Sequence, residues 1–249
     1  MDTSTGSDVG RPPTVGGTAH GEDARGRLWD RVAGIAGLIF FLLVVAGFFT
    51  PETPGSDRSP GDLARILTAD LTGHQWSLFF GFLADVAFLV LLAGIWSRLR
   101  RAEGPGGMFG ALFGVAGTAF LSVVLVSAGL TLALVEAPAV GADLSALPAL
   151  AVLDNWAGAA MLPAGVAMLL GAAGSIVSTR AYPVWLGWFA GVTSVLLLVS
   201  VAAVFESSED ETGFLGIIGF ASFILMLLWF LAASIVMLLH RSRAAQPVA

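Results

Sequence analysis

The sequence predicts an all-α fold: a polytopic membrane helix bundle with six transmembrane helices and both termini in the cytoplasm. Hydrophobic residues make up 56% of the 249 positions and charged residues only 12%, against about 25% charged residues in ordinary soluble domains. The apolar residues also fall into long blocks, and the basic residues flank these blocks unevenly. The composition predicts a membrane protein, the length of the blocks predicts helices, and the basic residues predict how those helices are oriented.

Each apolar block exceeds the roughly 20 residues with which a helix crosses about 30 Å of hydrocarbon. Lipid offers no hydrogen bonds to the backbone, so a segment of this length in a bilayer has to be helical. The six predicted crossings are Leu28–Thr50, Gln75–Arg98, Met108–Ala137, Ala149–Val177, Pro183–Phe205 and Gly213–Leu239.

The basic residues set the predicted orientation, because cytoplasmic loops carry an excess of them. All twelve are arginine, and only Arg58 and Arg65 fall in a predicted outer loop. Both termini are therefore predicted to be cytoplasmic. The arginines on that side are Arg11, Arg25, Arg27, Arg31, Arg98, Arg100, Arg101, Arg180, Arg241 and Arg243.

Two tails flank the predicted transmembrane domain. Residues 1–26 are rich in Gly, Thr and Pro with mixed charge, which is typical of a disordered segment. A signal peptide has a short basic start and an apolar core of about 7–15 residues, whereas the first block here is longer and follows this tail. We therefore expect a retained first helix, with a disordered cytoplasmic tail at 1–26, a transmembrane domain at 27–241 and a short cytoplasmic tail at 242–249.

The first outer loop contains SPGDLARILTADLTG, which predicts a short amphipathic helix. Ser59 suits the N-cap, Pro60 the first helical position, and Asp62 the first turn, where the helix dipole favours an acid. Leucine and isoleucine recur at helical spacing behind them. Two roles stay open for this helix: a connector resting on lipid headgroups, or a lid over a cavity.

Small residues recur every four positions along the third crossing, and shorter stripes of the same kind occur in the fourth and fifth. Such stripes let another helix approach closely. That helix belongs either to the same chain or to a second copy, so a homodimer through these stripes is one of the two open interpretations. The longest stripe consists of Gly106, Gly110, Gly114, Thr118 and Ser122.

One carboxylic acid, Asp85, lies deep in the second crossing, within the stretch GFLADVAFLVLLAGIW. It follows Gln75 by ten residues, which places it roughly 15 Å below the outer face and close to the bilayer centre. An ionisable residue at this depth costs about 2.5–3.5 kcal/mol on insertion scales and is by default a functional candidate. Three serines at similar depth complete a candidate ligand-binding polar layer: Ser122, Ser194 and Ser222.

Asp85 has two open roles. In the structural role it donates to a serine or to the carbonyl of Ala159, which Pro163 leaves without its usual amide partner. In the functional role it lines a cavity and takes up a proton or a cationic ligand. Proton-coupled transport uses several ionisable groups along a path, and the core helices offer one, which argues against a transporter.

Polar residues near the predicted outer ends of the helices form a second group of candidates. A catalytic or metal site needs two or three such groups converging within hydrogen-bond reach, and a single histidine makes a poor zinc site. No HExxH, GxSxG or P-loop motif occurs, so we assign no catalytic residue and no metal ligand. The outer-rim candidates are His74, Gln75, Glu136, Asp154, Asn155 and Glu206.

Two absent residue types exclude several kinds of chemistry. Without cysteine there are no disulfides, thiolate nucleophiles or Cys-ligated metal centres, and without lysine there is no lysine Schiff base. The net charge of −6 comes mostly from acids in the predicted outer loops and gives no support to nucleic-acid binding. We expect no cofactor, and membrane lipid as the first partner.

Four stretches give the chain a resemblance to a family: RLWDRVAGIAGLIF at the first crossing, SPGDLARIL, SRLRRAEG, and TRAYPVWLGW at the fifth crossing. Over roughly residues 28–240 the chain resembles uncharacterised six-helix integral membrane proteins of high-GC bacteria, which are grouped as domains of unknown function. The resemblance implies an all-helical bundle in the inner membrane. It implies no activity and no site residues.

The sequence thus leads to a multi-pass protein of the bacterial plasma membrane. We expect a non-enzymatic binding or accessory protein with a small outward-facing cavity near Asp85 for a lipid or apolar molecule. The alternatives are a membrane-embedded enzyme that uses the outer-rim carboxylates with His74, and a small transporter centred on Asp85.

Overall fold

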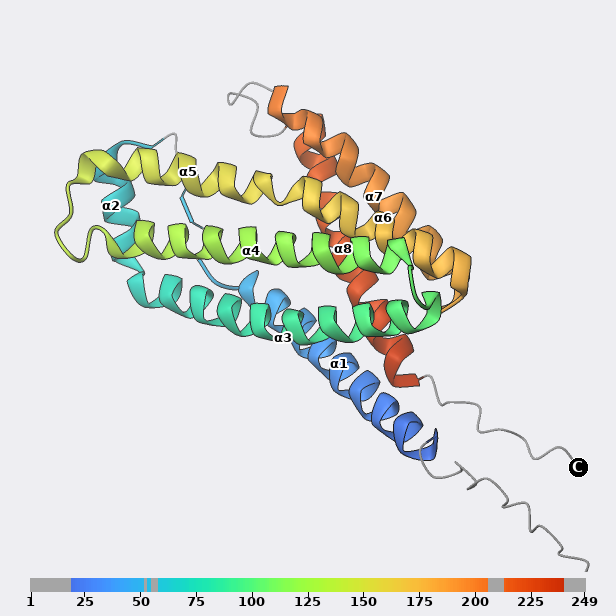
Figure 1. The fold of residues 1–249 in the computed structure, drawn as a ribbon. Coiled ribbons are helices and arrows are strands. Elements are labelled where there is room, and N and C mark those ends of the chain that lie inside the picture. The colour runs from blue at the N-terminus through green and yellow to red at the C-terminus, as the bar shows by residue number, and fades with distance from the viewer. Residues whose placement is uncertain (1–18, 52, 55–57, 206–212, 240–249) are drawn as a thin grey trace, which may run out of the picture.

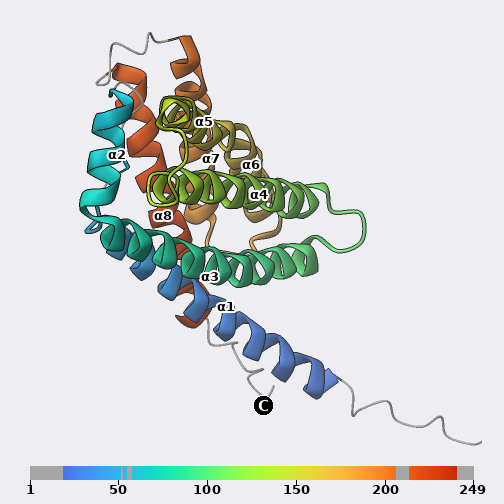
Figure 2. The ribbon, with the colours of Figure 1, turned by 90° about the vertical axis from the view of Figure 1, so that its left-hand side faces the viewer.

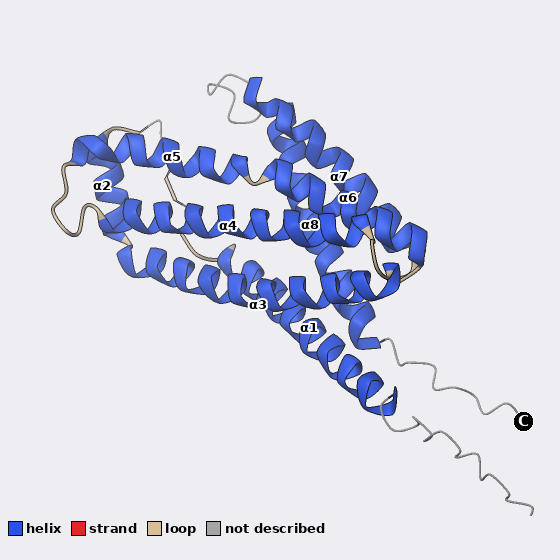
Figure 3. Cartoon of the chain, viewed as in Figure 1, coloured by secondary structure: helices blue, strands red, loops and turns tan. Residues whose placement is uncertain are grey.

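The computed structural model describes residues 19–51, 53–54, 58–205 and 213–239, and these residues form helices and connecting loops without a β-strand (Figures 1 and 3). The predicted all-α class is confirmed. The α-helices are α1 (Ala19–Gly47), α2 (Pro60–Ala69), α3 (Leu71–Glu103), α4 (Met108–Glu136), α5 (Leu147–Ala160), α6 (Leu162–Thr179), α7 (Val184–Ser200) and α8 (Phe214–Leu239). Two short 3-10 helices, Leu144–Ala146 and Val201–Phe205, precede α5 and follow α7.

Within the described residues, 5 spans are long and apolar enough to cross a membrane: Leu28–Gly47, Leu71–Glu103, Met108–Glu136, Leu144–Thr179 and Phe214–Leu239. The remaining predicted crossing, Pro183–Phe205, corresponds to α7, an apolar helix of 17 residues that the 3-10 turn prolongs. The apolar spans indicate a membrane protein.

The predicted tails lie largely outside the described residues, which leave out 1–18 and 240–249. Helix α1 begins at Ala19, before the predicted end of the first tail at residue 26. Residues 19–26, which were predicted as part of the disordered tail, therefore belong to the first helix.

The spanning helices form a closed ring. Around it, α1 packs on α3, α3 on α4, α4 on α6, α6 on α7, α7 on α8, and α8 again on α1, while α5 lies against α4 (Figure 1). The core contains large, fully buried side chains such as Phe113 and Trp229. The indole Nε1 of Trp229 donates to the Leu186 carbonyl at 2.9 Å and so joins α8 to α7.

Glycines of the predicted stripes bring helices of the same chain together. A Cβ at Gly114 would overlap the Trp96 ring of α3, and a Cβ at Gly171 would meet the backbone of Phe113 in α4. This close approach of backbones is the usual role of small residues in membrane helices. Gly106, Thr118 and Ser122 of the longest stripe are exposed, and the homodimer stays a prediction.

The predicted fourth crossing is broken in two. α5 ends at Ala160 and α6 begins at Leu162, and Figure 3 shows the short loop between them. Pro163 occupies the first turn of α6. A proline inside a helix removes one amide donor and its ring clashes with the preceding turn, which is the physical reason for a break at this point.

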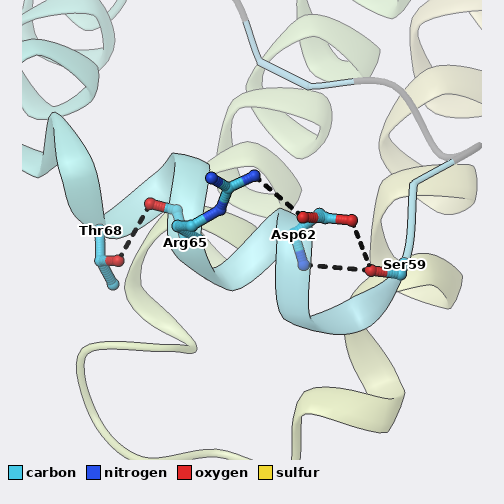
Figure 4. Close-up of polar contacts among 4 residues, drawn as sticks. All are labelled: Ser59, Asp62, Arg65 and Thr68. Atoms are coloured by element: carbon cyan, nitrogen blue, oxygen red, sulfur yellow. Dashed lines mark hydrogen bonds and ion pairs between the residues drawn. The ribbon is translucent and has the colours of Figure 1, made fainter.

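The predicted amphipathic helix is confirmed as α2 (Figure 4). Ser59 caps it: its Oγ accepts from the amide of Asp62 at 3.2 Å and donates to the Asp62 carboxylate at 2.8 Å. These contacts, the Ser59 hydroxyl first and Arg65 second, lower the pKa of Asp62. α2 therefore starts where the cap sequence predicts.

The apolar face of α2 is covered by protein. Leu63 and Leu67 are fully buried in a cluster that also contains Leu134 and Val135 of α4 and Leu147 of α5. Figure 2 shows α2 standing upright beside the near ends of α4 and α5. The apolar face of α2 thus packs on protein, but no α2 residue lines a cavity, so the lid role stays a prediction. The end of the bundle that contains α2 is called the α2 end.

Charged residues join three elements at the opposite end. Asp30 of α1 forms ion pairs with Arg98 at 3.8 Å and Arg101 at 3.0 Å, both in α3. The Arg98 guanidinium lies over the Tyr182 ring, 4.4 Å from its centroid, and donates to the Ala181 carbonyl at 3.0 Å. The loop between α6 and α7 is thereby attached to α3.

Leu67→Ala should destabilise the α2 end. Truncating a buried leucine leaves a cavity and typically costs about 2–5 kcal/mol, so the unfolding midpoint of the detergent-solubilised protein should fall. Arg65→Ala is the control, because the Arg65 side chain is 77% exposed and its loss should leave the midpoint unchanged. Equal midpoints for both variants would show that α2 is not packed on the bundle.

Candidate functional site

The centre of the α2 half of the bundle contains a cavity of about 390 Å³. Side chains of α1, α3, α4, α5 and α8 line it together with Met161, at the break between α5 and α6, and Thr53, in the loop before α2. Most of the lining is apolar. The polar side chains in it are Thr53, His74, Ser77, Asp85, Ser127 and Thr131.

The α3 wall of the cavity is one continuous helix face. Counted from His74, its lining residues lie 3, 4, 7, 10, 11 and 14 positions further on, a helical spacing that places them on one side of α3. Gly81 and Ala84 precede Asp85 on this face and leave room beside its carboxylate, because a Cβ at Gly81 would meet nothing within 4 Å. The face consists of His74, Ser77, Leu78, Gly81, Ala84, Asp85 and Phe88.

The depth of Asp85 follows from the register of α3 against α4. Gln75 Nε2 donates to Glu136 Oε1 at 2.9 Å near the α2 end. Counting from this pair, Asp85 lies about 15 Å along α3 and Val124 about 18 Å along α4. The two residues are therefore at similar depth on facing walls, and Phe88 lies one turn deeper.

Four phenylalanines, one from each of four helices, form the floor. The Phe88 ring centroid lies 5.0 Å from Phe40 of α1, 6.0 Å from Phe120 of α4 and 4.9 Å from Phe230 of α8. The Phe88–Phe230 pair is edge-to-face, at 86°, an arrangement that aromatic rings prefer. The cavity thus has an apolar base below Asp85, and its other polar side chains lie toward the α2 end.

Asp85 is half-buried, and within the described part of the chain no hydrogen bond or ion pair engages its carboxylate. The tie to a serine or to the Ala159 carbonyl, which the sequence left open, is not formed there. No arginine lines the cavity and the chain contains no lysine. The geometry therefore leaves this acid available to whatever enters the cavity.

The three serines predicted to share a polar layer with Asp85 do not line its cavity. Ser194 is buried and donates to the Val166 carbonyl at 3.0 Å, which joins α7 to α6. Ser222 is buried and donates to Ile218 of its own helix, and Ser122 is exposed and donates to Thr118 of its own helix. Equal depth did not bring them together, because each points in a different direction around its helix.

The outer-rim candidates do not form one cluster. His74 is only 3% exposed and lines the cavity, whereas Gln75 and Glu136 bond each other outside it. Asp154 accepts from Thr131 at 2.7 Å and from Ser127 at 3.5 Å.

The last two rim candidates lie elsewhere. Asn155 is exposed and does not line this cavity, and Glu206 lies outside the described residues.

These placements do not assemble a catalytic constellation. No hydrogen bond or ion pair joins the His74 ring to Glu136 or Asp154 among the residues that the structure describes. Those same residues contain no group of three His, Cys, Asp or Glu that could hold a metal ion. Asp154 also lies well inside α5, about 10 Å from its first residue, where it bonds a cavity-wall threonine and does not cap a helix.

Four polar cavity residues were missed by sequence reasoning: Thr53, Ser77, Ser127 and Thr131. Ser77 could have been found, because it lies eight residues before Asp85 and hence on the same face of α3. Ser127 and Thr131 share a face of α4, but which face of α4 meets α3 is decided by the packing of the two helices.

Thr131→Val should weaken the contact between α4 and α5. It removes the hydroxyl that donates to the Asp154 carboxylate while keeping the shape of the side chain. Hydrogen bonds between membrane helices contribute about 0.6 kcal/mol on average and up to about 1.7 kcal/mol. The unfolding midpoint in detergent should fall by a corresponding amount. Thr118→Val is the matched control, because Thr118 is exposed and bonds only Gly114 of its own helix; an equal drop for both variants would argue against the interhelical bond.

In comparisons with known proteins, the chain matches no family model, no curated protein and no solved structure. The cavity and its residues are therefore the basis for assigning a function.

Proposed function

We propose that this protein is a six-span, non-enzymatic binding or accessory protein of the bacterial plasma membrane that holds a lipid or apolar molecule in an outward-facing cavity near Asp85. One observation carries the proposal: a mostly apolar cavity of about 390 Å³ contains a carboxylate that no protein group engages within the described residues. Ligand sites have this character, with apolar walls of about 300–1,000 Å³ and a few polar groups that orient the ligand.

The distribution of arginines supports the outward orientation of the cavity. Arg98, Arg100 and Arg101 close α3 at the end away from α2, whereas Arg65 belongs to α2 itself. By the positive-inside rule the α2 end, and with it the polar part of the cavity, faces outward. α7 and its 3-10 extension supply the fifth crossing, so that α8, the sixth, returns the chain to the cytoplasm. The resemblance to six-helix bacterial membrane proteins agrees with this topology.

The state of the rim residues favours binding over catalysis. Glu136 is bonded to Gln75, and Asp154 to Thr131. A general acid or base has to lie within reach of its partner and its substrate, and His74 bonds neither carboxylate. What the cavity provides for a ligand is space, apolar surface and a few polar contacts.

The orientation can be tested with single cysteines, since the chain has none of its own. Ala139→Cys lies in an exposed loop at the α2 end and Ala102→Cys is exposed near the end of α3 at the opposite end. A membrane-impermeant maleimide should label intact cells only through the Ala139 variant, because arginine-rich segments stay in the cytoplasm. Labelling of Ala102 in intact cells would reverse the proposed orientation.

Ligand binding can be tested by filling the cavity. The probe is a neutral long-chain alcohol with a diazirine on its chain, added to the full-length protein in phosphatidylcholine nanodiscs and mapped by mass spectrometry after illumination. In the wild type, we expect labels on cavity-lining residues of α3, α4 and α8. Gly81→Phe should reduce these labels severalfold, because its ring would occupy the open space beside Asp85.

Gly129→Phe is the matched control for this experiment. Gly129 is also an exposed helix glycine with nothing within 4 Å of a Cβ, but it does not line the cavity. The control should label like the wild type. If the probe labels only lipid-facing residues, or labels the Gly81 variant as strongly as the wild type, the cavity does not bind the alcohol and the proposal fails.

A further inference from the structure

A second cavity of about 440 Å³ lies beside the first, between α5, α6, α7 and α8. Two polar residues, Asn155 and Ser200, contribute to its lining, and the Ser200 hydroxyl bonds the Leu197 carbonyl of its own helix. The remaining walls that it does not share with the first cavity are apolar: Ala159, Leu162, Gly165, Leu197, Leu215, Gly216, Gly219 and Phe220.

The two cavities share a wall. Phe120, Gly158, Met161, Phe223 and Met226 line both of them. The wall includes the break between α5 and α6, at Met161, where the regular helix is interrupted. At Gly158 a Cβ would meet nothing within 4 Å, so the wall has no side chain at this position and no neighbouring atom takes its place.

Gly158 and Asp85 lie at similar depth. Ser127 of α4 contacts Asp154 of α5 at 3.5 Å, which sets these two residues level. Gly158 lies four residues, or about 6 Å, deeper along α5, and Val124 three residues, or about 4.5 Å, deeper along α4. Val124 is itself level with Asp85, so the glycine in the shared wall is at the height of the carboxylate.

Charge selects the class of ligand. Among the residues lining the two cavities, the ionisable side chains are Asp85 and His74, and no arginine is present. A carboxylate among apolar walls interacts strongly with charge, because the local dielectric constant is low. A cationic headgroup is attracted there, whereas an anionic headgroup meets an acid and no basic partner.

We propose that the two cavities together hold one single-chain amphiphile, with an amine-type cationic headgroup beside Asp85 and its chain passing Gly158 into the second cavity. This inference rests on the proposed function, in which the first cavity binds a ligand. It adds the chemical class of that ligand and assigns the second cavity to its chain. The apolar second cavity suits a hydrocarbon chain, since burying each methylene contributes about 0.8 kcal/mol.

The test uses three probes, each with a diazirine at the end of its chain: a short alkylamine, a long alkylamine, and a fatty acid as long as the latter. They are added to the full-length protein in phosphatidylcholine nanodiscs and mapped after illumination. The short amine should label the first cavity, and the long amine the residues around Leu197 and Phe220 in the second. The fatty acid should label both severalfold less.

Two variants test the path of the chain. Gly158→Leu places a side chain in the shared wall, and Gly216→Leu fills the second cavity from α8, each in open space. Both should reduce second-cavity labelling by the long amine severalfold. Gly216→Leu should also leave labelling by the short amine unchanged, because Gly216 does not line the first cavity. Gly129→Leu is the control and should change neither. Asp85→Asn should reduce labelling by both amines and not by the fatty acid.

The outcomes separate the two proposals. If the amines label the first cavity but the long amine does not label the second, only this further inference is overturned. The same holds if the long amine labels the second cavity in the Gly158 and Gly216 variants as strongly as in the wild type. Equal labelling by the amines and the fatty acid would show that the site does not select a cationic headgroup. Equal labelling of Asp85→Asn and of the wild type by the amines would show the same. If no probe, including the neutral alcohol, labels the first cavity, the proposed function fails as well.

Discussion

The contacts of Phe88 are the interaction on which the site depends. Its ring touches Phe40, Phe120 and Phe230, so one side chain of α3 joins α1, α4 and α8. Lipid tails are as apolar as these rings, so packing and ring geometry hold the helices together here rather than exclusion of water. Below this level the bundle is filled with buried side chains, and above it the same four helices enclose a cavity.

The cavity gives a physical reason for an acid in the middle of a membrane helix. A carboxyl at this depth facing lipid would carry the full cost of insertion, whereas one facing a cavity is sheltered from the lipid chains and open to the ligand that we propose. The neighbours of Asp85 on its own helix are small, Gly81 and Ala84, and keep that space open. The second carboxylate at depth, Asp154, is instead bonded by Thr131 and serves to join α4 and α5.

The interrupted helix lies between the two cavities. Pro163 ends the regular hydrogen bonding between α5 and α6, and both the break and the nearby Gly158 lie in the wall that the cavities share. α2 packs through Leu63 and Leu67 on α4 and α5 at the outer end of the bundle and lines neither cavity.

The sequence by itself determined the helical class, the apolar blocks and the start of α2, because these depend on local composition, on backbone hydrogen bonding and on the cap at Ser59. It also singled out Asp85, since depth in a helix can be counted. Only the tertiary structure decided which side chains meet. Ser122, Ser194 and Ser222 had suitable depth but face away from the cavity, whereas Ser127 and Thr131 face it. Depth follows from counting residues along one helix, but facing depends on how each helix is rotated against its neighbours, and side-chain packing from the whole ring sets that rotation.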